Sequence, residues 1–341
     1  MINFESDYTK GCIPEILEEL IKTNAMQTPG YGTDEYCDEA KKLIKNACQL
    51  KDADIHFLVG GTQTNTTVIA SILKPHQGII CADTSHIYVN ETGAIEATGH
   101  KCLALPGNNG KLDALQIEEV INNHLNAEDS FHYVQPGMIF ISFPTETGLL
   151  YSKQELTAIY NIAKKYQLPL FIDGARLGYG LTADNNDLSL VELAHNCDVF
   201  YIGGTKIGAL FGEAVVISNQ NYQKDFKYHI KQHGGLLAKG RLLGIQFKML
   251  FENNRYFEIS KHANKMANKI KKALIEKGYS FQYPPESNQL FVIVENCKLA
   301  ELKKEINFHT NGKIDEQHTA IRLVTCFMTN ENDVDYLISL L

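Results

Sequence analysis

Short apolar runs alternate with amphipathic stretches from about residue 54 to residue 218, and this alternation most constrains the fold. Parallel strands joined by crossover helices produce such a pattern, because the strands are buried on both faces and each helix on one. The sequence therefore predicts an α/β fold on a mainly parallel seven-stranded sheet. The expected strands begin at Asp54, Gly78, Lys101, Met138, Leu168, Asp198 and Glu213.

The stretch of residues 152–166 is the clearest expected connecting helix. Its apolar side chains recur three or four residues apart, and Ser152 is suited to cap the first turn. After Gly235 the pattern changes to long helices, most clearly at residues 255–278, with strands expected near residues 289 and 320. These features predict a smaller C-terminal α+β domain. We divide the chain into an N-terminal segment (1–45), a large domain (46–240) and a small domain (241–341).

Composition limits the classes of partner. The formal net charge is −8, whereas nucleic acids and anionic membranes attract clustered positive charge. The sequence has no run of about 18 apolar residues, and its first residues lack the pattern of a signal peptide. The eight cysteines include no CxxC pair and no Cys/His cluster of metal-ligand spacing. We expect reduced thiols, no metal, and a cytoplasmic protein whose partner is a small molecule rather than nucleic acid or membrane.

The segment VGGTQTN, residues 59–65, places a glycine turn and the start of a helix after the first expected strand. Glycines let the backbone approach an anion, and the N–H groups of a helix N-terminus favour phosphate. The segment matches neither GxGxxG nor GxxxxGK[ST], so dinucleotide and P-loop sites lose support. It indicates either a phosphate site at this turn or an ordinary tight turn with Thr62 as the helix N-cap.

Two charged residues end later strands. Asp173 closes the apolar run of FIDGARLG, where a carboxylate can hydrogen-bond a protonated ring nitrogen and keep a pyridinium ring an electron sink. The alternative is an Asp that caps the next helix. Lys206 lies in the glycine-rich, almost uncharged stretch FYIGGTKIGALFG. Apolar surroundings lower a lysine pKa, as a Schiff-base lysine requires, and Thr205 could bond a phosphate. The alternative is an exposed loop lysine.

His86 in SHIYVNE follows another expected strand. Its imidazole could stack on a flat cofactor ring and transfer protons near neutral pH. A single histidine is more often a surface or core group, but here it accompanies a glycine turn, an aspartate and a lysine. All four features lie at expected carboxyl ends of one sheet, where open α/β sheets bind ligands.

This order of phosphate turn, histidine, DGAR and lysine resembles the threonine aldolase and β-eliminating lyase family of fold-type-I, aspartate-aminotransferase-like enzymes, which use pyridoxal 5'-phosphate (PLP). The resemblance extends over nearly the whole chain. It implies that PLP forms a Schiff base with Lys206, that His86 stacks on its ring, and that Asp173 meets its pyridine nitrogen. The residues that it assigns to the cofactor are Gly60, Gly61, Thr62, His86, Asp173, Arg176, Thr205 and Lys206.

The resemblance also implies a site for an amino acid. Arg176 in DGAR and Arg322 in AIRLVT match arginines that bind the substrate carboxylate, and Ser6 in FESDYTKG matches a serine that assists them. Tyr31 in GYGTDEY resembles a tyrosine that reaches into the neighbouring subunit's site. We therefore expect a homodimer or homotetramer with shared active sites, to which residues 1–45 contribute contacts.

The chain departs from the family pattern close to the chemistry. Typical members have SKGLGAP around the lysine and an ENTH-like strand end, where this chain has TKIGALFG and SFPTETG. The family usually places an arginine after a glycine pair to bind the partner subunit's phosphate. In HGGLLAKGR that position is Leu237, which leaves Lys239 or Arg241 as possible substitutes.

The expected reaction is cleavage of a β-hydroxy-α-amino acid, threonine or allo-threonine, to glycine and an aldehyde. Lys206, His86 and Asp173 are the expected catalytic residues, with His86, directly or through water, as the base for the β-hydroxyl proton. Alternatives are β-elimination or transamination of another amino acid on the same scaffold. Outside this class, the chain could bind a sugar or regulatory ligand on a PLP-type fold, or be an ordinary nucleotide-binding protein.

Overall fold

The seven expected strands form one sheet in the computed structural model, which describes residues 2–341. The strand order is β2-β8-β7-β6-β5-β3-β4, and β8 runs antiparallel to both of its neighbours while the other four pairings are parallel. The prediction of a mainly parallel seven-stranded sheet is therefore confirmed. The strands are β2 (Asp54–Leu58), β3 (Gln77–Ala82), β4 (Lys101–Leu105), β5 (Gln135–Ser142), β6 (Leu170–Asp173), β7 (Val199–Gly203) and β8 (Glu213–Ile217).

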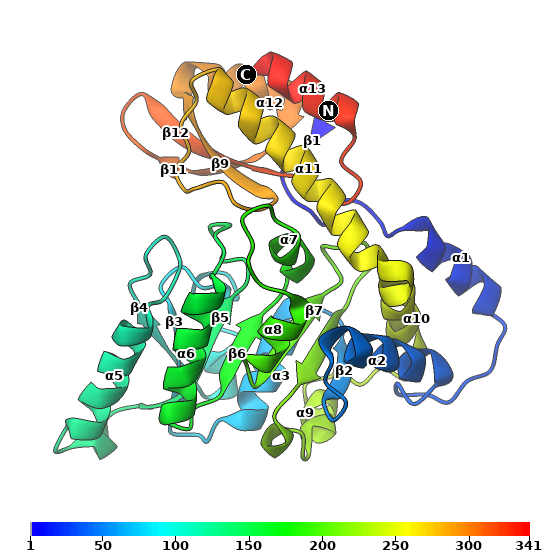
Figure 1. Cartoon of the computed structure of the whole chain (residues 1–341), viewed down its shortest axis with the longest axis vertical. Coiled ribbons are helices and arrows are strands. Elements are labelled where there is room, and N and C mark those ends of the chain that lie inside the picture. The colour runs from blue at the N-terminus through cyan, green and yellow to red at the C-terminus, as the bar shows by residue number, and fades with distance from the viewer. Residues whose placement is uncertain (1) are drawn as a thin grey trace.

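Side chains from the two faces of the sheet enter two separate hydrophobic cores. Phe171 lies in one core and its neighbour Ile172 in the other, because successive residues of a strand point to opposite faces. Helices α5, α6 and α8 lie side by side over one face (Figure 1), and α3 and α9 contribute to the core on the other. The helices of this part are α3 (Gly61–Ile72), α4 (His86–Val89), α5 (Ala114–Asn126), α6 (Lys153–Lys165), α7 (Leu177–Leu181), α8 (Leu190–His195) and α9 (Phe226–Gln232).

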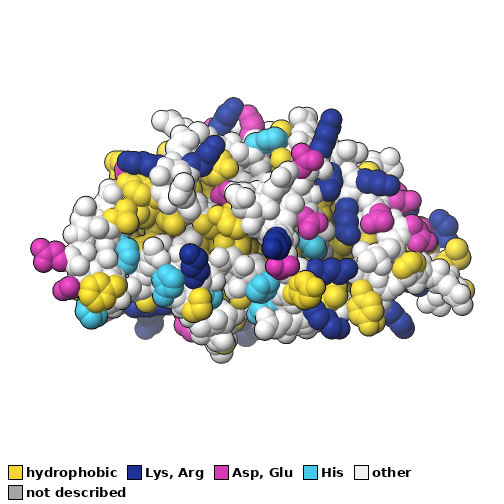
Figure 2. All heavy atoms as spheres, turned by 90° about the horizontal axis from the view of Figure 1, so that it is seen from below, with side chains coloured by type: hydrophobic (Ala, Val, Ile, Leu, Met, Phe, Trp, Pro, Cys, Tyr) yellow, Lys and Arg dark blue, Asp and Glu magenta, His cyan; other side chains and the backbone are white. Residues whose placement is uncertain are grey.

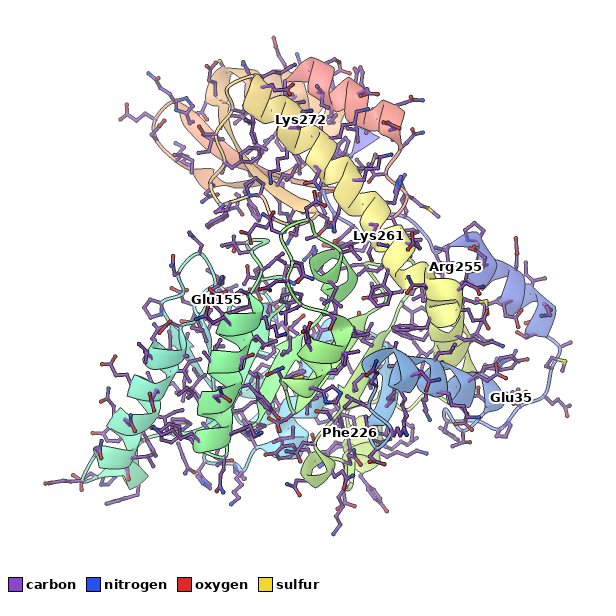
Figure 3. All side chains as sticks on the ribbon, in the orientation of Figure 1. Glu35, Glu155, Phe226, Arg255, Lys261 and Lys272 are labelled. Atoms are coloured by element: carbon purple, nitrogen blue, oxygen red, sulfur yellow. The ribbon has the colours of Figure 1, made fainter. Side chains whose placement is uncertain are left out.

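Helix α6 confirms the predicted helix at residues 152–166. The Ser152 side chain accepts a hydrogen bond from the Glu155 amide, and the Glu155 side chain accepts one from the Ser152 amide. This reciprocal capping box satisfies amides that a helix start would otherwise leave free. Figure 3 labels Glu155 at the end of α6 nearest the small C-terminal sheet. The face with Leu156, Ile159 and Ala163 is buried, as the spacing predicts.

A second, three-stranded antiparallel sheet of order β11-β12-β9 lies beyond the large sheet (Figure 1). It packs with α11 and α13 around a third core, which includes Phe4 from the start of the chain. The strands are β9 (Gln289–Glu295), β10 (Ile306–Asn307), β11 (His309–Lys313) and β12 (His318–Val324). The helices are α11 (Arg255–Glu276), α12 (Asn296–Glu305) and α13 (Glu331–Leu340). Helix α10 (Arg241–Phe251) precedes them in the chain, and several of its apolar side chains lie in the same core of the large sheet as Ile172.

The N-terminal residues connect the two parts of the molecule. Strand β1 (Ile2–Asn3) pairs with β10 in parallel, and the Val324 amide donates to the Phe4 carbonyl. Helix α1 (Pro14–Thr23) and helix α2 (Glu35–Cys48) instead pack against α10. Figure 3 labels Arg255 where α11 begins, and its guanidinium forms an ion pair with Glu15 of α1 at 3.2 Å.

Short 3-10 turns complete the description, at Glu96–Thr98, Ser130–His132, Gln220–Tyr222 and Glu252–Asn254. Within residues 2–341, none of the helices has the length and apolar character needed to cross a membrane. On the face shown in Figure 2, acidic and basic side chains are interspersed around apolar patches.

Candidate active site

The carboxyl ends of β2, β3, β6 and β7 meet at one edge of the sheet, and the segments that follow them line one cavity. This inner cavity is bordered by the predicted cofactor residues from all four places: Gly60, Gly61, Thr62, His86, Asp173, Arg176, Thr205 and Lys206. An adjoining outer cavity is lined by His86, Glu146, Arg176, Lys206, Tyr283 and Arg322, among others. The structure thus brings together groups that lie as far apart as β2 and β12.

Helix α3 begins at the inner cavity. Its N-cap is Gly60 rather than Thr62, so the alternative of Thr62 as an N-cap is wrong. No side chain caps this end, and the first N–H groups of a helix have no partner within the helix. A β-carbon on Gly61 would lie 3.2 Å from the Tyr201 hydroxyl. The turn is therefore open to an anion and leaves little room for a side chain at Gly61.

Lys206 lies in the turn after β7, between the two cavities. Tyr179 donates a 2.6 Å hydrogen bond to its carbonyl, and the Gly212 amide donates a 2.9 Å bond to the neighbouring Thr205 hydroxyl. These bonds fix the loop that carries the lysine. Burial and the nearby charge of Arg176 lower the pKa of Lys206. A lowered pKa increases the uncharged, nucleophilic form of the amine.

Asp173 and His86 are joined by a chain of buried polar groups. Nδ1 of His86 lies 2.9 Å from Oε1 of Glu91, and that same oxygen accepts a 2.8 Å bond from Asn65. Asn65 also donates to Oδ2 of Asp173 at 3.4 Å. The other Asp173 oxygen accepts from the Ala175 amide at 2.9 Å, so this carboxylate holds the turn after β6 as well as lining the cavity.

Sequence reasoning did not assign roles to Glu91 and Asn65. Both lie inside segments that were singled out, SHIYVNE and VGGTQTN. The Glu91 side chain is completely buried, and buried carboxylates require partners. What the sequence lacked was the pairing itself, because it joins residues from different strand ends.

Arg176 is held by Asp7 of the N-terminal segment. Nε of Arg176 donates to Oδ2 of Asp7 at 2.7 Å, and Nη2 donates to Oδ1 at 3.0 Å. Asn288 also donates to Oδ2, at 3.1 Å. Burial acts to raise the pKa of Asp7, but the charges of Arg176 and Lys206 outweigh it and hold the pKa below its ordinary value. Asp7 was not predicted as a site residue, although it follows Ser6 in the segment that was.

Arg322 reaches the outer cavity from β12. Its Nη2 donates only a long bond, 3.4 Å, to the Glu5 carbonyl, and its buried Nε has no partner within residues 2–341. Burial and the charge of Arg176 lower its pKa. Two guanidinium groups therefore border one cavity, and Asp7 neutralises only one of them. The guanidinium of Arg322, which has no carboxylate partner in residues 2–341, is suited to bind a carboxylate ligand.

The other residues that the sequence singled out border neither of these two cavities. Ser6 is buried, borders neither cavity, and its hydroxyl has no hydrogen-bond partner in residues 2–341. Tyr31 is 47% exposed, and it lines a different surface cavity together with Leu237. The guanidinium of Arg241 donates to the carbonyls of residues 23, 24 and 26 of its own chain, whereas Lys239 is exposed.

Besides Glu91, two more carboxylates that sequence reasoning missed border the inner cavity. Glu213 accepts a 3.1 Å bond from the Gly204 amide, and burial raises its pKa to about 8. Glu146 accepts bonds from the His86 amide and the Ser142 hydroxyl, and its pKa is raised by burial and by the charge of Asp173. The sequence offered one signal only, because Glu146 lies in the SFPTETG segment that departs from the family. No group of His, Cys, Asp or Glu side chains suited to a metal ion occurs within residues 2–341.

Comparison with known proteins gives consistent matches. The family model described as beta-eliminating lyase matches residues 3–297. A low specificity L-threonine aldolase of a Pseudomonas species is 30% identical over 89% of this chain and 87% of its own length. The solved structure of a Leishmania major threonine aldolase matches with a TM-score of 0.97 and 41% identity, over 100% of this chain and 98% of that one. An aspartate aminotransferase of Thermus thermophilus, with a TM-score of 0.72 and 12% identity over 100% of this chain and 90% of its own, shares the fold.

Proposed function

The chain belongs to the beta-eliminating lyase family, and on this basis we propose that it is a PLP-dependent aldehyde-lyase that cleaves threonine or allo-threonine to glycine and acetaldehyde. The observation that carries this proposal is the position of Lys206. It lies between an inner cavity suited to the cofactor and an outer cavity where Arg176 and Arg322 can receive an amino-acid carboxylate.

The inner cavity suits PLP in chemistry as well as in place. The uncapped start of α3 offers free N–H groups to a phosphate, and Gly61 leaves room for it. Lys206, with its lowered pKa, would hold the cofactor covalently through its amine. His86 would lie against the face of the ring, and Asp173 would keep the ring nitrogen protonated. When bound, PLP supplies a sink for the electron pair released as a bond to Cα breaks.

The outer cavity would orient the substrate. Arg322 has a buried Nε without a partner, and Nη1 of Arg176 is not engaged by Asp7. Paired guanidinium donors bind a carboxylate in a fixed plane. Fixing the carboxylate also fixes the bond between Cα and Cβ relative to the ring, and this orientation decides which bond breaks.

We also propose that two or more copies of the chain share their active sites. Tyr31 and Leu237 line the same surface cavity, which does not include Lys206 of their own chain. This position supports a role for Tyr31 in the active site of a neighbouring subunit. Arg241 is engaged by its own chain, so Lys239 is the candidate to replace the family's phosphate-binding arginine.

Exposed Cys297, with no disulfide formed among residues 2–341, supports a reducing, cytoplasmic location.

Product analysis tests the function. The purified protein with PLP is incubated with threonine and, separately, allo-threonine, and the amino acids and carbonyl products are quantified. We expect equimolar glycine and acetaldehyde. Release of 2-oxobutyrate and ammonia would identify β-elimination, and formation of glutamate from added 2-oxoglutarate would identify transamination.

A further inference from the structure

Glu146 is one of the residues that line both cavities. It follows β5 in the segment SFPTETG, residues 142–148, where the chain departs from its family. His86 and Lys206 border the same two cavities. A side chain that lines both cavities can contact the part of a substrate that extends beyond Cα, and in a β-hydroxy amino acid this part carries the hydroxyl.

Only one of the two carboxyl oxygens of Glu146 is used by the protein. Oε1 accepts a hydrogen bond of 2.8 Å from the His86 amide and one of 2.7 Å from the Ser142 hydroxyl. Oε2 accepts no hydrogen bond from another side chain of residues 2–341. Two donors on one oxygen fix the orientation of the group, which leaves Oε2 as a preorganised acceptor in the cavity.

His86 is less suited to take a proton from the substrate. Its Nδ1 is engaged by the buried Glu91. If the His86 imidazole stacks on the PLP ring, its Nε2 points outward in the plane of the imidazole. It would then not point at a substrate hydroxyl that lies above or below the PLP ring. The backbone of His86, by contrast, contributes directly to the orientation of Glu146 through its amide.

We propose, on the basis of the function proposed above, that Glu146 is the base that accepts the proton of the substrate β-hydroxyl. The O–H bond breaks and its proton moves to Oε2. The O–H electron pair becomes the second bond of the aldehyde carbonyl, while the Cα–Cβ electron pair stays with the glycine half. The proton on Oε2 then returns to solvent, and a proton added at Cα completes glycine. Burial raises the pKa of Glu146, which makes its carboxylate a stronger acceptor.

Glu146→Gln is a close test of this role. The amide oxygen can accept the same two bonds from His86 and Ser142, but an NH2 group replaces Oε2 and cannot take a proton. Two reactions are compared in the PLP-loaded enzyme: threonine cleavage, and exchange of the glycine α-proton with deuterium from solvent, followed by NMR. Glycine has no β-hydroxyl, so its exchange requires the cofactor and the carboxylate site but not this base.

We expect Glu146→Gln to lower kcat for threonine by at least about 100-fold, the range for loss of a general base, with glycine exchange and the cofactor absorbance changed by less than about 3-fold. Glu146→Asp keeps a carboxylate on a shorter side chain, and its kcat for threonine should lie between those of the wild type and Glu146→Gln. The competing variant is His86→Phe, which keeps a ring for stacking but has no nitrogen.

Selective loss of threonine cleavage in His86→Phe, with near-normal cleavage in Glu146→Gln, would overturn the proposal in favour of His86. Equal loss of cleavage and of glycine exchange in Glu146→Gln would also overturn it, because the residue would then serve the cofactor. A wild-type enzyme that exchanges glycine but cleaves no β-hydroxy amino acid would overturn the function itself, and this result is visible before any variant is made.

Discussion

Arg176 and Asp7 form two parallel hydrogen bonds, of 2.7 and 3.0 Å, although they are 169 residues apart in sequence. The pair joins the N-terminal segment to the turn after β6, and the Asp7 side chain is completely buried. Through it, the first residues of the chain determine the position of a guanidinium that borders both cavities.

Asp7→Asn should therefore destabilise the protein, because it leaves a buried guanidinium without its counter-ion. We expect a loss of about 3 kcal/mol in the free energy of unfolding at pH 7, measured by urea titration. The folded pKa of Asp7 is lowered, so the stabilisation is present above the unfolded pKa, about 4, and is lost as the pH falls through the folded value. The difference between the two proteins should shrink below pH 4, and a constant difference would argue against the ion pair.

Lys206 should be the lysine that holds PLP. Its lowered pKa and its place between the cavities predict a yellow protein whose colour is lost in Lys206→Ala. After borohydride reduction and digestion, mass spectrometry should find the cofactor on the peptide containing Lys206. An adduct on a different lysine would contradict this model of the site.

Asp173→Asn should keep the cofactor but slow catalysis. The amide preserves the shape of the side chain and can still hold the turn at Ala175, but it no longer stabilises a proton on the ring nitrogen. We expect kcat for threonine to fall by at least about 100-fold, as when a key electrostatic group is removed. Steady-state kinetics and the absorbance spectrum measure both effects, and near-normal turnover would place the ring carboxylate elsewhere.

Arg322→Lys should weaken the grip on the substrate carboxylate without loss of colour. Arg322 lies in the small sheet and borders only the outer cavity, and lysine cannot reproduce two parallel hydrogen bonds. We expect a higher KM for threonine and a kcat/KM lowered by roughly 10-fold to 1000-fold. If the kinetics do not change, this arginine does not bind the substrate.

Glu213→Gln should change how stability depends on pH. Burial raises the pKa of Glu213 from its ordinary value of 4.5 to about 8, so between these values the folded state binds more protons than the unfolded state. Stability then decreases as the pH rises through this window, by up to about 1.4 kcal/mol per pH unit. Glutamine can still accept the Gly204 amide bond and does not titrate. In cofactor-free protein, the free energy of unfolding of the variant should increase relative to that of the wild type from pH 5 to pH 8. Parallel stability profiles would contradict a buried, protonated Glu213.

The sequence was sufficient where local pattern determines structure. The apolar runs predicted all seven strands of the large sheet, since buried parallel strands leave a continuous local signal. The same logic placed Gly60, His86, Asp173 and Lys206 at one edge, because the carboxyl ends of such strands meet there.

The remaining contacts depend on pairings across the chain. Nothing near Glu91 indicates that it faces Asn65, and nothing near Asp7 indicates Arg176. Glu146 and Glu213 were hidden for another reason. Glu213 is the first residue of β8 and Glu146 lies in the loop after β5. Charged residues at such positions are ordinarily solvated, and only the packing around them shows that Glu213 is buried and Glu146 partly buried. The N-cap of α3 is Gly60 rather than Thr62, and this difference of two residues is within the range over which helix ends are hard to place.

The pairing of β1 with β10 has a consequence for the order of events on the ribosome. Residues 2–7 are synthesised well before several of their partners, which are Asn288, residues 306–307 and Val324. At a synthesis rate of about 5–20 residues per second, these partners leave the ribosome tens of seconds after residues 2–7. The strands around Lys206 have left the exit tunnel before then. The half of the site proposed for PLP can therefore form on the nascent chain, whereas the arginine pair proposed for the substrate carboxylate is complete only after Arg322 has been synthesised.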